Sequence, residues 1–421
     1  IITGEFEGFA LNQMGTFNAG TSTIQIGDGS TSTVGSNGTN FKSNNCHNLI
    51  INQHLDAPNG DVQWRAYSGT EVTIGGDLTV TKGKFRPSVS TQDLTVTGDV
   101  DIASVGQVGT SSASGSNTFG SLTINSGGTY SATSGTTTLT GAEGTSGELR
   151  CFSATGGLSA FTHNNGKIKT TWNGAQQIYC NGVTQFYDLE LANGAPDDDD
   201  NVTIRQGSGD DCKIYGDLTV TGGNLKLYHS MRGLEIFGNT YVASTGIISA
   251  ADLTSDTMTH HGLVTNAGVY TTSSTTNNFN GGVRNLGTFT SNDTLTIGGT
   301  GGILEGNLDD AIINVNTDPV YGNFNATTSI LSSTSNDFDD IWDTNGGCFA
   351  AWIYPKSDGE SDSGRIVEKG SWIIHFSDES GTNMKLRLHH DFDGDNGRWD
   401  TTNYVIPQNA WTHLAIVYDS D

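Results

Sequence analysis

Basic residues, proline and long apolar runs are all scarce in this chain, and each scarcity narrows what the protein can do. The 421 residues include 19 Lys and Arg against 45 Asp and Glu, a formal net charge of −26. Such a chain would repel the phosphates of nucleic acid, which we therefore exclude as a partner. No apolar run of roughly 18 residues occurs, which excludes a membrane-spanning helix. We interpret the acidity as a solvated surface that resists self-association, with divalent-cation binding as the alternative.

Cysteine is also sparse and unpatterned. The five cysteines are Cys46, Cys151, Cys180, Cys212 and Cys348. Their odd number and wide spacing exclude a disulfide framework and a zinc knuckle, so we predict buried free thiols. The sequence begins at Ile1 rather than Met and stops in a strand-like run, so we expect a fragment of a longer protein.

What the chain has instead is glycine and short strands. It contains 57 Gly and only 6 Pro, and Ser, Thr and Asn replace the residues that build helices, so we predict an all-β protein. The phrase Gly-Asp-Leu-Thr-Val-Thr occurs at 76–81 and 216–221 and is echoed at 93–97. Apolar residues alternate with polar ones in each copy, which predicts one rung of a solenoid with Leu and Val inside. Further rungs are predicted at 98–102, 121–125, 136–140, 202–205 and 294–298.

The rungs offer no recognisable catalytic motif. Asp77, Asp99 and Asp217 directly precede strands, where we predict that their side chains cap turns. The pairs His260-His261 and His389-His390 lack the spacing of a metal site, and we predict surface or turn positions for them. No Ser-His-Asp elbow, HExxH or phosphate loop is present, so we predict that the protein is not an enzyme.

A longer pattern carries a resemblance. An aromatic residue followed by an Asn-Leu-Thr-Ile-Asn-like strand recurs at 41–52, 119–125 and 161–191. This resembles the degenerate β-solenoid repeats of phage structural proteins and bacterial surface proteins, over about residues 1–310. The resemblance implies an elongated β-solenoid, for which right-handed coiling is the default expectation. A β-propeller is the competing architecture, but no blade signature is found.

The composition changes after Leu308. Five of the seven Trp residues lie beyond residue 319, which predicts a β-solenoid stalk over 1–314 and a second domain over 315–421. The segments 321–330, 348–355, 364–370, 384–388 and 410–419 resemble the laminin-G/concanavalin-like jelly-roll family. The resemblance implies a β-sandwich that is incomplete at the C-terminus. It also implies glycan or protein binding, often beside a calcium ion at the rim.

The strands of this second domain are apolar on both faces. Phe349, Ala351 and Ile353 alternate with Ala350, Trp352 and Tyr354, and the strand around Leu414 has the same character. We therefore expect each strand to lie between a sandwich core and a covered outer face.

Two acidic clusters are the candidate metal sites, with calcium as the one candidate cofactor. Asp391, Asp393 and Asp395 place carboxylates at alternate positions, as a calcium loop does, but the glycine and the final glutamate of an EF-hand are missing. The second cluster is Asp197, Asp198, Asp199 and Asp200, whose charges repel unless a cation lies among them. A solvated acidic hairpin and a solvated loop, respectively, are the favoured interpretations.

Together these features predict a rod-like stalk that presents a lectin-like module. We predict a structural and adhesion component of a phage virion, located on the virion surface. A bacterial cell-surface adhesin or filament protein is the first alternative, and a polysaccharide depolymerase on a β-helix is the second. The expected partners are a cell-surface glycan or protein and other virion or surface proteins. A homo-oligomer is expected as well.

Overall fold

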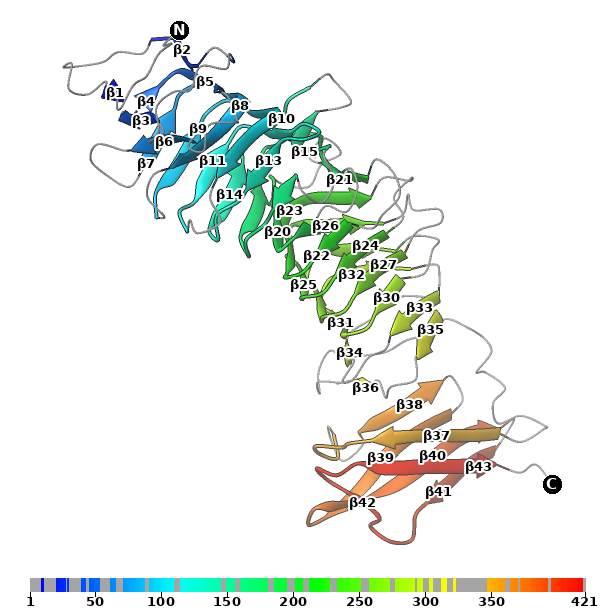
Figure 1. Cartoon of the computed structure of the whole chain (residues 1–421). Helices are drawn as coiled ribbons and strands as arrows, with labels where there is room; N and C mark the ends of the chain where they lie inside the picture. The colour runs from blue at the N-terminus through cyan, green and yellow to red at the C-terminus, as the bar shows by residue number, and fades with distance from the viewer. Residues whose placement is uncertain are drawn as a thin grey trace. The chain divides into compact units, whose positions relative to one another are not determined.

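The computed structural model contains a solenoid of parallel strands and a unit of antiparallel strands (Figure 1). Residue contacts divide the chain into Ile1–Asn323 and Phe324–Asp421, whereas the sequence placed the boundary after residue 314. The structure describes residues 9–10, 20–27, 29, 39–42, 45–53, 61–65, 71–87, 91–109, 114–144, 149–155, 160–180, 185–194, 201–206, 212–227, 233–250, 257–272, 277–291, 294–297, 303–305, 312–315, 321–322, 347–359, 364–369, 372–392 and 395–418.

One side of the solenoid is a column of parallel strands, named sheet 1. Its strands are β2 (Thr23–Ile26), β5 (Asn48–Asn52), β8 (Leu78–Pro87), β10 (Val100–Gly109), β12 (Leu122–Ile124), β15 (Arg150–Ala154), β18 (Gln176–Cys180), β21 (Asn201–Gln206), β23 (Leu218–Leu227), β26 (Gly246–Ser249), β29 (Val269–Thr271) and β32 (Thr288–Thr290).

A second column, named sheet 2, is also parallel throughout. Its strands are β4 (Asn45–Cys46), β7 (Glu71–Ile74), β9 (Asp93–Val96), β11 (Asn117–Phe119), β14 (Thr136–Leu139), β17 (Lys167–Thr170), β20 (Asp188–Ala192), the first part of β23, β25 (Thr240–Val242), β28 (Val264–Asn266), β31 (Gly282–Asn285), β34 (Ile303–Glu305) and β36 (Tyr321–Gly322).

The remaining side is built from two separate sets of parallel strands. Sheet 3 contains β1 (Phe9–Ala10), β3 (Thr39–Lys42), β6 (Asp61–Arg65), the second parts of β8 and β10, β13 (Thr129–Ser131) and β16 (Phe161–Thr162). Sheet 4 contains β19 (Gln185–Phe186), β22 (Cys212–Ile214), β24 (Gly233–Ile236), β27 (Thr257–His260), β30 (Asn277–Phe279), β33 (Thr294–Ile297) and β35 (Ile312–Val315).

Each coil visits sheet 2, then sheet 1, then sheet 3 or sheet 4. Val264 pairs with Val283, 19 residues later, whereas Thr137 pairs with Ile168, 31 residues later. The number of residues in a coil therefore varies along the solenoid. The β-solenoid and the predicted rungs are confirmed.

The interior follows from the alternation of apolar and polar residues. Leu78 and Val80 in the first copy of the repeated phrase are fully buried, as are Leu218 and Val220 in the second. Burying one such side chain stabilises the fold by about 1.5–3 kcal/mol. No single rung could bury this face alone, because each is covered by the rungs before and after it.

The two copies of the phrase lie on different sides of the solenoid. Leu78 lies in sheet 1, where it pairs with Leu49 and Val100. Leu218 lies in sheet 2, where it pairs with Leu189 and Thr240. The phrase therefore encodes a corner and the strand that follows it, but not the side of the solenoid on which that strand lies.

The aspartates before these strands connect neighbouring coils. Asp77 Oδ1 accepts a hydrogen bond from the Asp99 amide at 3.0 Å, and Asp217 Oδ1 accepts one from the Asn239 amide at 2.8 Å. Asp77 in turn donates its own amide to Asn48 Oδ1 at 2.9 Å. The sequence predicted that these aspartates cap turns. In the structure, the carboxylates of Asp77 and Asp217 each cap the corner of the next coil.

The second unit contains two antiparallel sheets. The first pairs β37 (Gly347–Ile353) with β43 (Thr412–Tyr418), and the second contains β38 (Arg365–Lys369), β39 (Trp372–Ser380), β40 (Asn383–Phe392), β41 (Asp395–Asp400) and β42 (Ile406–Pro407). Its core is Trp372, Ile374, Phe376, Met384, Leu386, Leu388, Ile406 and Leu414. Within the described ranges, no helix has the length and apolarity that a membrane crossing requires.

Candidate functional site

The pair of strands β37 and β43 has one face on the core and the other in solvent. Phe349, Ile353 and Ile416 pack against the core of the unit. The opposite face, named the neutral outer face, carries no carboxylate, Lys or Arg. It consists of Cys348, Ala350, Trp352, Tyr354, Trp411, His413, Ala415 and Val417, all of them exposed.

The alternation predicted two apolar faces, and the strands have them. The expected cover over the outer face is absent from the described part of the chain, where Trp352 is 66 % exposed and Val417 is 73 % exposed. An antiparallel sheet normally turns polar side chains to water, and contiguous exposed apolar faces are common at interaction sites.

Antiparallel pairing gathers the aromatic rings at one end of this face. Trp352 pairs with His413 across the strands, and their ring centroids lie 5.1 Å apart. The Tyr354 and Trp411 rings lie 5.5 Å apart in an edge-to-face arrangement. The small Ala350 and Ala415 form the next cross-strand pair. The result is a ring platform beside a shallow, uncharged strip.

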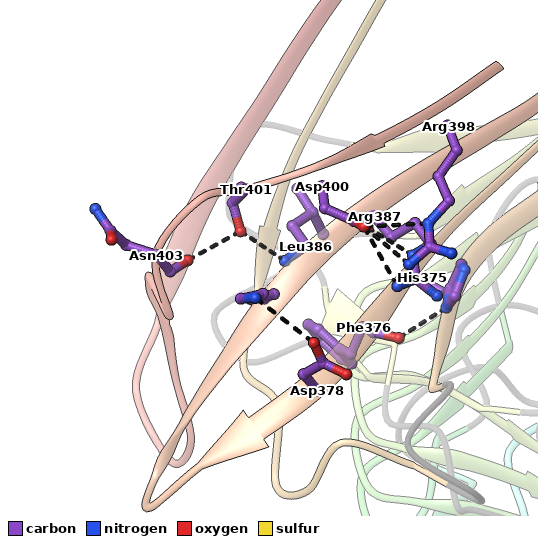
Figure 2. A network of polar contacts seen from close by, with 10 residues as sticks. His375, Phe376, Asp378, Leu386, Arg387, Arg398, Asp400, Thr401 and Asn403 are labelled. Atoms are coloured by element: carbon purple, nitrogen blue, oxygen red, sulfur yellow. Dashed lines mark hydrogen bonds and ion pairs between the residues drawn. The ribbon is translucent and has the colours of Figure 1, made fainter.

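The five-stranded sheet has a polar outer face (Figure 2). Asp400 accepts hydrogen bonds from Arg387 Nε at 2.5 Å and from Arg398 Nε at 3.1 Å, so two guanidinium groups share one carboxylate. Lys385 lies 3.5 Å from Asp378 and its ammonium lies 4.9 Å from the centre of the Tyr404 ring. The Arg387–Asp400 contact joins β40 to β41, and the Lys385–Asp378 contact joins β40 to β39.

Two further groups complete this polar network. His375 Nδ1 lies 2.7 Å from the Phe376 carbonyl oxygen, and burial lowers the pKa of the His375 ring. Thr401 accepts a hydrogen bond from the Leu386 amide at 3.1 Å and donates one to the Asn403 carbonyl. Because the Asp400 carboxylate is already satisfied by two arginines, we assign this network a structural role (Figure 2).

The predicted acidic sites lie largely outside the described residues. Asp391 lies at the end of β40, where it is exposed and 3.5 Å from His389 Nε2. Asp393 and the side chain of Asp395 are not described, and neither are Asp197 to Asp200. Among the side chains that are described, no three His, Cys, Asp or Glu come together as metal ligands would. Calcium binding at either cluster stays a prediction.

The prediction of surface or turn histidines is wrong for His260. This ring is fully buried inside the solenoid, where Nδ1 lies 2.7 Å from Thr240 Oγ1 and Nε2 lies 2.9 Å from the Tyr270 hydroxyl. Burial lowers the pKa of His260 to about 3, with His261 adding to the effect. The periodicity of Thr257–His260 held the correct signal, because His260 follows the buried Met258 by two residues.

The prediction that the cysteines are buried free thiols is confirmed for four of the five. Cys46, Cys151, Cys180 and Cys212 are buried and free, and burial raises the pKa of Cys46 and of Cys151 to about 12. Cys348 is exposed on the neutral outer face, so the prediction is wrong there.

Two carboxyl groups on the solenoid, those of Asp101 and Glu143, have raised pKa values. Burial raises the pKa of Asp101 above its ordinary value, against the effect of a hydrogen bond from Asn125 at 2.7 Å. Burial also raises the pKa of Glu143, and the charges of Asp99, Asp101 and Asp77 raise it further. Perturbed carboxyl groups are common in active sites and in purely structural clusters alike.

Comparison with known proteins agrees with this architecture. Residues 325–421 match the family model described as the Concanavalin A-like lectin/glucanases superfamily. No curated protein and no solved structure matches the chain. The chain is therefore an all-β protein in which a β-solenoid precedes a Concanavalin A-like domain.

Proposed function

We propose that this protein is a structural and adhesion component of a particle or cell surface. In this proposal the solenoid is a stalk, and the Concanavalin A-like domain binds a glycan through its neutral outer face. The observation that carries the proposal is the exposure of Trp352, Tyr354 and Trp411 on a face without charge.

The chemistry of this face favours a sugar over a charged peptide. An aromatic ring offers a flat apolar surface that suits the C–H faces of a pyranose. The absence of carboxylates, Lys and Arg leaves no partner for a charged ligand. His413, beside Trp352, supplies a polar group that can hydrogen-bond a sugar hydroxyl.

The solenoid supports the stalk role through its construction. Each coil contacts its neighbours through continuous ladders in sheets 1 and 2, and Asp77 and Asp217 link coils at the corners. Such stacking gives a stiff spacer whose length increases with coil number. We favour a phage virion over a bacterial cell surface because the chain has free thiols rather than disulfides.

A glycan array probed with the full chain tests the binding claim. The proposal expects selective retention of uncharged glycans, insensitive to added salt because no ion pair contributes. Retention of no glycan, together with ordered assembly seen by electron microscopy, would leave a scaffold role only.

A polysaccharide depolymerase is the second candidate, and the raised pKa values of Asp101 and Glu143 are the observation that favours it. Hydrolysis of a glycosidic bond needs one carboxyl group that is protonated and one that is ionised. Incubation with bacterial capsular polysaccharides, followed by size-exclusion chromatography, tests this directly. We expect no shortening, and shortening that disappears in Glu143→Gln would establish the enzyme.

A further inference from the structure

The neutral outer face presents different chemistry at successive positions along its strands. Because β37 and β43 pair in register, every second residue of each strand forms a cross-strand pair on this face, and successive pairs lie about 7 Å apart. Trp352 pairs with His413, and the next outward pair is Ala350 with Ala415. All four side chains are exposed. A ligand that crosses from one pair to the next therefore meets an indole, an imidazole and then two methyl groups.

Trp352 and His413 offer an apolar surface beside a hydrogen-bonding group. The Trp352 side chain is 66 % exposed, so most of the indole is accessible to a ligand. Its ring centroid lies 5.1 Å from that of His413, with an angle of 53° between the two ring planes. A neutral imidazole has one donor and one acceptor nitrogen, so His413 can bond either the N–H or the carbonyl oxygen of an amide.

The alanine pair belongs to a strip that has little to offer a hydroxyl group. Ala350 and Ala415 are followed on this face by Cys348 and Val417, which pair with each other, and Val417 is 73 % exposed. None of these four side chains carries a charge, a hydroxyl or an amide. A sugar hydroxyl placed over them would lose hydrogen bonds to water without a replacement, whereas a methyl group would gain from burial. The strip therefore favours an apolar substituent.

We propose that the uncharged glycan bound by the neutral outer face contains N-acetylhexosamine units. This inference rests on the glycan-binding function proposed above and specifies its ligand. The pyranose ring lies on Trp352, the amide of the acetamido group bonds His413, and the acetyl methyl lies over Ala350 and Ala415. Pyranose, amide and methyl thus follow the same order as the indole, the imidazole and the alanines. Acidic N-acetylated sugars are disfavoured, because this face carries no Lys or Arg.

Two matched pairs of uncharged oligosaccharides test the inference by titration calorimetry on the full chain. They are chitotriose with cellotriose, and N-acetyllactosamine with lactose, and the members of each pair differ only in carrying acetamido groups or hydroxyls. We expect the N-acetylated member of at least one pair to bind about tenfold more tightly than its counterpart. Burial of one methyl group contributes about fourfold, and one hydrogen bond contributes at least about twofold.

Two variants locate the preference on the face. Ala415→Gln covers the alanine pair with a polar side chain, so the N-acetylated ligand should bind about as weakly as its counterpart. Thr402→Gln, at an exposed position outside the neutral outer face, is the matched control and should bind like the wild type. His413→Phe keeps an aromatic ring but removes the hydrogen bond, and it should weaken the N-acetylated complex about threefold. This variant also serves if Ala415→Gln alters the fold.

The outcomes separate this inference from the proposed function. Equal affinity within both pairs, with binding weakened by Trp352→Ala, would overturn the inference and leave the proposed function intact. Equal losses of affinity in Ala415→Gln and Thr402→Gln would also overturn it. If no member of either pair binds, the inference fails, and the glycan array then decides the proposed function separately.

Discussion

Lowering the pH from 7 to 5 should destabilise the solenoid through His260. Its ring is fully buried, with Thr240 and Tyr270 as hydrogen-bond partners, and its pKa in the folded protein is about 3 against an ordinary 6.5. Above pH 6.5 the ring is neutral in both states and contributes no pH dependence. Between 6.5 and 3 the unfolded chain binds a proton that the folded chain does not, so stability falls as the pH falls.

The magnitude follows from the difference in pKa. Each pH unit below 6.5 costs about 1.4 kcal/mol of unfolding free energy, so the loss at pH 5 is about 2 kcal/mol. In the neutral ring one nitrogen donates and the other accepts, and the hydroxyl groups of Thr240 and Tyr270 can serve in either role.

Urea denaturation followed by circular dichroism at pH 7 and pH 5 measures this effect. The wild-type protein should lose about 2 kcal/mol more between the two pH values than His260→Gln, whose side chain is uncharged at both. His413→Gln, which removes an exposed histidine, should behave like the wild type. Equal losses in the wild type and His260→Gln would refute the reasoning, because the ring would then titrate alike in both states.

Three further predictions concern other parts of the chain. Gly98→Ala should destabilise the solenoid by about 1–3 kcal/mol, because the added Cβ would lie 2.1 Å from Asp77 Oδ1. Gly141→Ala, whose Cβ would meet nothing below 3.4 Å, should cost less than about 1 kcal/mol, and thermal denaturation measures both. Asp217→Ala should cost about 1 kcal/mol, since the Asn239 amide loses its acceptor, and Asp217→Asn should restore most of that in the same assay. A maleimide should label one thiol of the folded protein, Cys348, by mass spectrometry, and rapid labelling of several thiols would contradict the burial of the rest.

Strand positions could be predicted from the sequence because alternation is a local property. Leu78 and Val80 face inward on any side of the solenoid, so their burial follows from the two-residue period of a strand. The side itself could not be predicted. The phrase at 76–81 enters sheet 1 and the copy at 216–221 enters sheet 2, because the lengths of the intervening connections determine where each copy falls.

The candidate sites were harder to predict because they depend on contacts between distant residues. The ring nitrogens of the buried His260 are satisfied by Thr240 in sheet 2 and Tyr270 in sheet 1, on the other two sides of the solenoid. Tyr179 lies between Arg150 and Arg205 because two successive coils place β18 between β15 and β21. The two-residue period of Thr257–His260 indicates that His260 faces inward, but no local pattern identifies the residues that contact His260 or Tyr179. The apolar character of β37 and β43 was visible in the sequence, but whether another segment covers their outer face was not.

Glycan affinity of two tryptophan variants tests the proposed function most directly. Trp352 lies on the neutral outer face, and Trp399, which is 46 % exposed, lies on the five-stranded sheet of the same domain. For the uncharged glycan that binds most tightly on the array, Trp352→Ala should lower the affinity at least about fivefold, since stacking on one ring contributes roughly 1–3 kcal/mol. Trp399→Ala should leave that affinity unchanged. Equal affinity in wild type and Trp352→Ala would contradict the assignment of this face as the binding surface.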